Sequence, residues 1–289
     1  MRVLVIGASG LLGRVLLEEW HTDEVAGVSS RDGDVRSPQQ IQELFTRYRP
    51  ACTVLAAAYT DVDGCERDPR RAHEVNCLGA LNVATAARTA GSRLLFLSTD
   101  YVFDGSKTTP YTSEDPVCPI NVYGRSKADG EEYIRTIIPE CCIVRTSWLF
   151  GAVGRCFPNT ILELAQTRKH LTVVDDQKGS PTWNRDLARA IISLARLGAS
   201  GIVHVTNLGE CTWYQLAGEL MRTAGYTDVT VAPVTTAEFP RPARRPPYSV
   251  LSPSGLAAYG IEMRPWRETL ALYQDERQSH VASRRTVVS

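Results

Sequence analysis

Tyr123 and Lys127 are the residues whose types and spacing most directly suggest chemistry. They lie four positions apart, so on a helix they share one face. A tyrosine with an ordinary pKa of about 10 is a poor acid or base at neutral pH, but a neighbouring ammonium stabilises the phenolate and lowers that pKa. The pair therefore predicts a group that exchanges a proton with an oxygen atom.

A hydroxyl group should complete this site. The apolar run 94–97 is typical of a strand, and Ser98 and Thr99 follow it. In open parallel sheets, sites lie at the carboxyl ends of strands. We expect Thr99 to hydrogen-bond a substrate carbonyl beside Tyr123, and Ser98 is the competing choice. Because strand residues alternate faces, only one of the two can point at the site.

A glycine-rich turn near the N-terminus indicates a dinucleotide site. Gly7, Gly10 and Gly13 follow the apolar run 3–6 and open a helical pattern. The first glycine permits a tight turn, the second lets the backbone approach a pyrophosphate, and the third lets the helix pack on the sheet. The residues of this turn that we expect to bind the cofactor are Gly7, Ser9, Gly10, Leu11 and Leu12.

The segment after the second predicted strand indicates which dinucleotide binds. An acidic residue there would favour NAD, but the strand 25–28 runs into Ser29 and Arg31. Hydroxyls and a guanidinium suit a 2′-phosphate, although a solvated loop arginine is the alternative. We therefore predict NADPH, with NADH as the alternative. Asp34 and Val35 could receive the adenine, and a helix-capping or turn role is the alternative for Asp34.

Short apolar runs alternate with helical patterns, which predicts an α/β fold with a doubly wound, Rossmann-like parallel sheet. The expected strands are 3–6, 25–28, 53–57, 94–97, 142–144, 171–174, 202–205 and 229–232. The expected helices are 11–19, 39–48, 70–90, 122–137, 187–197 and 213–223. The proline-rich stretch 233–253 is expected to be a long ordered loop.

The same pattern predicts two structural units. Residues 1–150 should form the NADP-binding Rossmann domain, with 183–205 returning to it. Residues 151–182 and 206–275 should form a smaller α/β C-terminal substrate lobe. The polar stretch 278–289 is predicted to be a disordered tail.

The bulk composition excludes several classes of protein. The chain has 289 residues, and its 32 basic and 32 acidic side chains give a formal net charge of zero. We therefore expect neither nucleic acid nor a membrane surface as a partner. No apolar stretch approaches the roughly 20 residues that span a bilayer. Eight cysteines without metal or disulfide spacing indicate reduced, mostly buried thiols in a cytoplasmic protein.

Three motifs in this order resemble the extended short-chain dehydrogenase/reductases, and within them the dTDP-4-dehydrorhamnose reductases. They are the glycine turn, the segment 98–105 and the segment 121–127. The segments 56–63, 145–151, 179–182 and 241–246 add to the resemblance, which covers about residues 1–275. It implies reduction of the C4 ketone of a dTDP-6-deoxy-4-keto hexose, in particular dTDP-4-dehydro-L-rhamnose to dTDP-L-rhamnose.

The resemblance also implies residue roles. Tyr123 would protonate the C4 oxygen, Lys127 would hold the nicotinamide ribose, and Thr99 would orient the carbonyl. The other residues implied on the substrate side are Thr60, Asp63, Asp100, Tyr101, Trp148 and Arg245, with core packing as the alternative for Trp148 and a surface ion pair for Arg245. The other residues implied on the cofactor side are Ala56, Ala57, Ala58, Tyr59, Asn76 and Ser98, together with Tyr123 and Lys127.

At three positions this chain differs from the family pattern, so the roles of the family's residues there are not assigned to it. Cys156 stands where an asparagine often contacts the nucleotide phosphates. Some relatives bind Mg²⁺ through glutamates at a dimer interface, where this chain has Val15 and Arg185, neither of which is a ligand for a hard cation. We expect no metal and no Mg²⁺-bridged dimer, and hence a monomer or weak homodimer.

Two alternatives to this function stay open. One is a related deoxysugar 4-ketoreductase of a secondary-metabolite pathway. The other is a non-catalytic, NADP-binding regulatory subunit that resembles the β subunit of methionine adenosyltransferase. The intact Thr99, Tyr123 and Lys127 do not exclude the second alternative.

Overall fold

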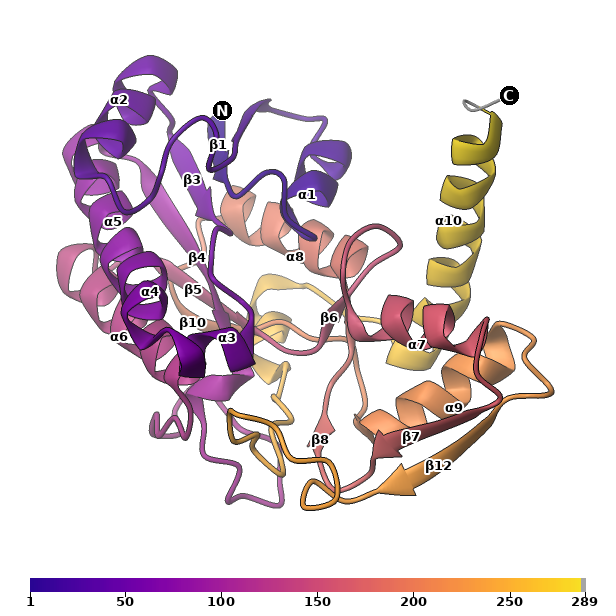
Figure 1. Cartoon of the computed structure of the whole chain (residues 1–289). Coiled ribbons are helices and arrows are strands. Elements are labelled where there is room, and N and C mark those ends of the chain that lie inside the picture. The colour runs from indigo at the N-terminus through magenta and orange to yellow at the C-terminus, as the bar shows by residue number, and fades with distance from the viewer. Residues whose placement is uncertain (287–289) are drawn as a thin grey trace.

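Six short strands form the central sheet, and each pair of neighbours in it runs parallel. The computed structural model describes residues 1–286, and it describes side chains as far as residue 280. The strand order is β10-β5-β4-β3-β1-β2 (Figure 1). The strands are β1 (Arg2–Ile6), β2 (Glu24–Val28), β3 (Cys52–Leu55), β4 (Arg93–Thr99), β5 (Cys142–Thr146) and β10 (Gly201–His204). The predicted doubly wound parallel sheet is confirmed.

Helices cover both faces of this sheet. Val3 and Val5 of β1 pack on one side, against α1 (Gly13–Glu19) and α8 (Asn184–Leu197). Leu4 and Ile6 point to the other side, which is covered by α2 (Pro38–Tyr48), α5 (Gly79–Ala90) and α6 (Val122–Ile137). Successive residues of β1 therefore point to opposite faces of the sheet, and the apolar residues on both faces are buried.

The helix predicted over 70–90 is three pieces in the structure. They are α4 (Pro69–His73), a π-helical turn η1 (Glu74–Leu78) and α5. A further helix, α3 (Val62–Arg67), precedes them and is capped by Asp61, whose carboxylate accepts from the Gly64 amide at 2.9 Å. A π-helical turn holds one residue more than an α-turn, and hydrophobic spacing over so few residues does not reveal it.

A smaller lobe packs beside the carboxyl ends of the sheet strands (Figure 1). Its core lies between a parallel strand pair, β7 (His170–Val174) and β12 (Thr230–Val234), and the helices α7 (Phe157–Ala165) and α9 (Trp213–Thr223). Short strand pairs join its loops. They are β6 (Leu149–Phe150) with β9 (Thr182–Trp183), and β8 (Lys178–Gly179) with β11 (Cys211–Thr212). Single 3₁₀ turns lie at η2 (Asp100–Val102) and η3 (Ser254–Tyr259).

The predicted disordered tail is wrong for its described part, because helix α10 (Trp266–Thr286) continues through it. Trp266, Leu270 and Tyr273 anchor this helix in the lobe core, and Glu276 pairs with Arg185. An anchored first half supplies a helical template that the polar residues after 278 extend. Residues 287–289 of the expected tail lie outside the described part.

Two further findings concern the described residues as a whole. No helix among residues 1–286 is long and apolar enough to cross a membrane. All eight cysteines lie in this range and are free thiols, of which Cys118 is the exposed one.

Candidate active site

The end of β4 and the first turns of α6 bring Thr99, Tyr123 and Lys127 together. Asn121 caps α6, since its carboxamide oxygen accepts from the Gly124 amide at 2.7 Å. A side chain at position 124 would collide with the carbonyl oxygen of Tyr101, so glycine lets the helix start against the end of β4. The rings of Tyr101 and Tyr123 consequently meet edge to face, with centroids 6.0 Å apart.

Strand alternation selects Thr99 over Ser98. The Ser98 hydroxyl donates to the Glu131 carboxylate inside the protein. Thr99 faces the other way and donates to Asp100 at 3.0 Å. Burial raises the pKa of Tyr123, and its hydrogen bond with Thr99 works in the opposite direction. The prediction of a threonine hydroxyl beside the tyrosine is thus met, while Ser98, expected at the cofactor, is turned into the core.

Lys127 does not act on Tyr123 as the sequence suggested. Its ammonium is buried, donates to the carbonyl oxygen of Leu97 at 2.6 Å and lies 3.8 Å above the centre of the Phe96 ring. Burial lowers the pKa of Lys127 to about 7. The expectation of a lowered pKa for Tyr123 is wrong for this structure, because burial of the phenol outweighs its neighbours and the ammonium is engaged elsewhere.

Glu131 is a residue of this region that the sequence analysis missed. It lies one helical turn beyond Lys127 on the same face of α6. Its carboxylate accepts from Arg145 at 2.6 and 3.0 Å, and both side chains are at most 5% exposed. Its charge favours the protonated form of Lys127. The signal in the sequence was its spacing, because Glu131 follows Lys127 by four residues, as Lys127 follows Tyr123.

Asp100 adds a titratable group next to Thr99. Burial raises the pKa of its carboxyl to about 7, and hydrogen bonds from Ser249 and Thr99 limit the rise. Near neutral pH this group therefore exists in both protonation states.

The glycine turn forms the floor of a cleft of about 690 Å³. Gly7 has a φ of +100°, and a Cβ there would lie 2.5 Å from the Ala57 nitrogen. Of the predicted cofactor residues, those that line this cleft are Gly7, Ser9, Gly10, Ser29, Asp34, Val35, Ala56, Ala57, Ala58 and Tyr59. Leu11, Leu12, Arg31, Asn76, Ser98, Tyr123 and Lys127 are not among its lining residues.

Asn76 acts from behind the cleft. Its carboxamide accepts from the Tyr59 amide at 2.7 Å and donates to the Tyr59 carbonyl and the Ser126 hydroxyl, each at 3.0 Å. The residue therefore ties the loop after β3 to α6. Its spacing in the sequence gave no hint of this role.

Two arginines that the sequence analysis passed over line the cleft, whereas Arg31 is exposed outside it. Arg36 forms an ion pair with Asp34 at 2.6 Å. Arg71 lies 4.5 Å from the centre of the Tyr59 ring. Asp34 also accepts from the Arg36 amide at 2.9 Å, so of its two expected roles the structure shows the turn.

The predicted substrate residues divide into two groups. Asp63 is buried and pairs with Arg241 and Arg245, while the Ala243 amide donates to it at 3.2 Å. Although burial works against it, the hydrogen bonds from Arg245 and Arg241 hold the pKa of Asp63 well below its usual range. Asp63 therefore ties the loop 241–246 to α3, and its expected place near the nicotinamide or the sugar stays a prediction.

The other group faces the lobe. Trp148 has a φ of +47°, and its ring stacks on Trp213 with centroids 3.4 Å apart. Such a backbone is uncommon for a bulky residue and persists where packing holds it. Arg245 hydrogen-bonds Tyr101 as well as Asp63, and Thr60 is exposed on the loop before α3. Tyr101 thus links the catalytic residues to the loop 241–246.

A parallel doubly wound sheet, a glycine turn at its first strand and a threonine beside a helical tyrosine and lysine define an extended short-chain dehydrogenase/reductase. The family model described as RmlD substrate binding domain matches residues 1–279. The chain belongs to this family, and the resemblance to dTDP-4-dehydrorhamnose reductases is confirmed.

Individual relatives match over nearly the whole chain. A dTDP-4-dehydrorhamnose reductase of Streptomyces griseus is 41% identical and covers 93% of this chain and 91% of its own length. A probable dTDP-4,6-dihydroxy-2-methyloxan-3-one 4-ketoreductase of Streptomyces antibioticus is 40% identical, with 93% of each chain covered. The crystal structure of dTDP-4-dehydrorhamnose reductase from Bacillus anthracis in complex with NADP is 37% identical, covers 95% of this chain and 99% of its own, and superimposes with a TM-score of 0.92.

Proposed function

We propose that this chain uses NADPH to reduce the C4 ketone of a dTDP-6-deoxy-4-keto hexose, converting dTDP-4-dehydro-L-rhamnose to dTDP-L-rhamnose. The observation that carries the proposal is the placement of Thr99 against Tyr123, one helical turn before Lys127, at the carboxyl end of β4. The names of the relatives support the same substrate class.

The residues of the cleft fit NADPH. Gly7 lets the turn lie against the Ala57 backbone, where a Cβ would collide, and Gly7 and Gly10 line the cleft without side chains that would keep a pyrophosphate away. Ser30 and the guanidinium groups of Arg36 and Arg71 line the same cleft and would hold a 2′-phosphate. The carboxylate of Asp34 also lines the cleft, but it forms an ion pair with Arg36. It therefore does not favour the free ribose hydroxyls of NADH over the 2′-phosphate of NADPH.

The chain's own residues carry the proton and the orientation. NADPH supplies a hydride when bound. Tyr123 donates its proton to the C4 oxygen, and Thr99 orients that oxygen by a hydrogen bond. Lys127, one helical turn beyond Tyr123, would hold the ribose hydroxyls with the ammonium that donates to the Leu97 carbonyl oxygen. Thr99 and Lys127 are buried, which excludes water from them, so their hydrogen bonds are stronger than in solution.

Substrate binding would use the surface between the loop 241–246 and the lobe. Tyr101 and Trp148 supply rings against which a sugar can pack. Arg245 has a guanidinium that reaches Tyr101 and would also meet a diphosphate. Asp63 would hold this loop in place through its ion pairs with Arg241 and Arg245. We further propose that the chain works as a monomer or weak homodimer in the cytoplasm, since Arg185 is already paired with Glu18, Glu19 and Glu276 of its own chain.

The test is turnover by the purified chain with dTDP-4-dehydro-L-rhamnose and NADPH, followed by NMR of the product sugar. We expect NADPH oxidation equal to the dTDP-L-rhamnose formed, with NADH as a slower donor. Formation of the C4 epimer would favour the related deoxysugar ketoreductase, which the Streptomyces antibioticus relative supports. Tight NADPH binding without any oxidation would favour the non-catalytic subunit and overturn the proposal.

A further inference from the structure

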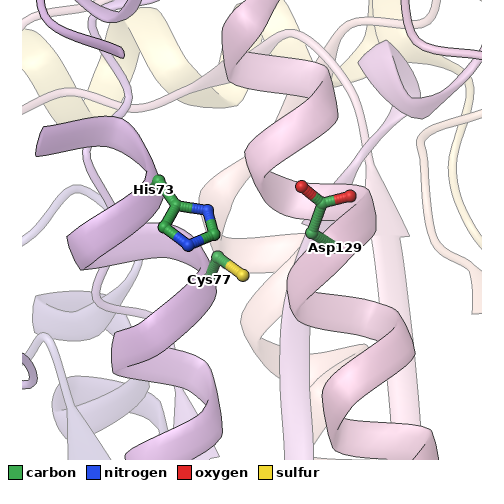
Figure 2. A group of neighbouring side chains, drawn as sticks. All are labelled: His73, Cys77 and Asp129. Atoms are coloured by element: carbon green, nitrogen blue, oxygen red, sulfur yellow. The ribbon is translucent and has the colours of Figure 1, made fainter. Parts of the chain in front are cut away.

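His73, Cys77 and Asp129 form a cluster of potential metal ligands outside the active site. One ligand atom from each residue lies within 4.8 Å of one atom from each of the others. His73 ends α4, Cys77 lies in the π-helical turn η1, and Asp129 lies on α6 (Figure 2). Asp129 follows Lys127 by two residues, so it lies on a different face of α6 from the catalytic pair.

Close packing of α6 on η1 brings these three residues together. A Cβ at Gly130 would lie 2.6 Å from the carbonyl oxygen of Asn76, so glycine permits the contact. The Asn76 carboxamide donates to the Ser126 hydroxyl at 3.0 Å and fixes the two elements to each other. Cys77 and Asp129 are the chain neighbours of Asn76 and Gly130. The cluster therefore stands on a rigid contact between two helical segments, as a preorganised site requires.

The outer two side chains have no competing partner. Among the side chains described, which end at residue 280, neither the imidazole of His73 nor the carboxylate of Asp129 makes a hydrogen bond or ion pair. Elsewhere, structural carboxylates of this chain are engaged, as Asp63 and Asp186 show. A half-buried carboxylate without a partner is available to a cation at little cost.

The electrostatic surroundings also favour a cation. The carboxylates of Asp129 and Glu132, both on α6, lie close enough to act electrostatically on the Cys77 thiol. A divalent cation bound between His73, Cys77 and Asp129 would be attracted by this negative charge and would displace the thiol proton.

We propose that His73, Cys77 and Asp129 bind a borderline-soft divalent cation, Zn²⁺, as three protein ligands with a fourth position open to water. Imidazole, thiolate and carboxylate are the ligands that Zn²⁺ takes, at about 2.0–2.3 Å, which separates tetrahedral ligands by roughly 3.3–3.7 Å. The ligand atoms need to approach one another by at most about 1.5 Å, which the exposed imidazole and the half-buried carboxylate can supply by rotation.

A cavity beside the cluster supplies the entry path and the open position. It has a volume of about 480 Å³, and His73, Asp129 and Glu66 are among its lining residues. His73, which is exposed, lies between this cavity and solvent, and Cys77 is the buried member of the cluster. A bound cation would link η1 to α6 and thereby brace the helix that carries Tyr123 and Lys127.

The experiment uses the full chain, stripped with a chelator and titrated with Co²⁺ and then Zn²⁺ alone. We expect one ion per chain, a thiolate-to-cobalt charge-transfer band in the near ultraviolet, and a rise in Tm with Zn²⁺. His73→Gln and Asp129→Asn, which change accessible side chains, should each weaken Zn²⁺ at least about 10-fold. Cys77→Ala should abolish the charge-transfer band.

Matched controls separate this site from adventitious binding. Cys118→Ala removes the exposed thiol and His170→Gln removes an exposed imidazole, and both should bind the ion as the parent does. The proposal is overturned if the stripped chain binds no Zn²⁺ at micromolar concentration. It is also overturned if Zn²⁺ affinity is the same in His73→Gln and Asp129→Asn as in the parent, or if Cys118→Ala alone removes it. Neither result bears on the reductase proposal.

Discussion

Replacing Glu131 with glutamine should shift the pH dependence of catalysis, because Glu131 is the buried carboxylate that favours the charged form of Lys127. The substitution keeps the shape of the side chain and its hydrogen-bonding capacity towards Ser98. It removes one negative charge from a region in which Arg145 and Lys127 remain. The effect on Lys127 is thus electrostatic.

The magnitude follows from helix geometry. Side chains four positions apart lie about 6 Å from each other. Two unit charges at that separation interact by about 3 kcal/mol at an effective dielectric constant of about 20, which corresponds to roughly 2 pKa units. The pKa of Lys127, about 7 in the parent, should therefore fall by about 1–2 units in Glu131→Gln. Since the protonated lysine is the active form, activity is lost as pH rises through this pKa, and the variant loses it at lower pH.

The assay is kcat/KM for NADPH oxidation between pH 5 and 9, with the exposed Glu132→Gln as the control on the same helix. At pH 7 we expect about 10-fold lower kcat/KM in Glu131→Gln and a parent-like profile in the control. The unpaired Arg145 should also cost about 3–5 kcal/mol of stability, so the double variant Glu131→Gln/Arg145→Met provides a better folded second test. An unshifted alkaline limb in both variants would refute the reasoning.

Three further outcomes are expected. Arg36→Ala should weaken NADPH about 10-fold while changing NADH little, whereas Arg31→Ala should alter neither Kd, as measured by fluorescence titration. Asp63→Asn leaves two guanidinium groups without their carboxylate, so KM for the nucleotide sugar should rise about 10-fold or more at unchanged NADPH affinity. Burial lowers the pKa of His204 to about 4 in the folded chain. As pH falls below about 6.5, the unfolded chain takes up a proton at this residue and the folded chain does not. The free energy of unfolding therefore decreases until pH reaches about 4. Between pH 7.5 and pH 5, the free energy of unfolding measured with urea should decrease by about 2 kcal/mol less in His204→Gln than in the parent. An equal decrease in both proteins would contradict this account.

Local sequence patterns predicted the sheet and the catalytic elements because both depend on short-range spacing. The alternation of apolar runs and helical patterns indicated the parallel strands, and four-residue spacing placed Tyr123 and Lys127 on one face. The sequence alone could not decide between Thr99 and Ser98. Because side chains alternate along a strand, only one of the two can face the site, but the alternation does not show which one. The structure decides it by pairing Ser98 with Glu131.

Features that join distant segments were not visible in the sequence. The pairing of Asp63 with Arg241 and Arg245 spans about 180 residues, and no local pattern encodes it. The same holds for the contact between Cys77 and Asp129, which depends on how α6 packs against η1. The sequence analysis chose Arg31 and not Arg36 as the arginine at the 2′-phosphate. The direction of the Arg36 side chain depends on its ion pair with Asp34, which the sequence does not reveal.

The central claim is that Tyr123 delivers the proton to the C4 oxygen, and Tyr123→Phe tests it most directly. The change removes one oxygen atom and keeps the ring that packs against Tyr101. In a stopped-flow assay with dTDP-4-dehydro-L-rhamnose, the account predicts an NADPH oxidation rate at least about 100-fold below the parent, with NADPH affinity and Tm nearly unchanged. A variant that turns over at the parental rate would contradict the account.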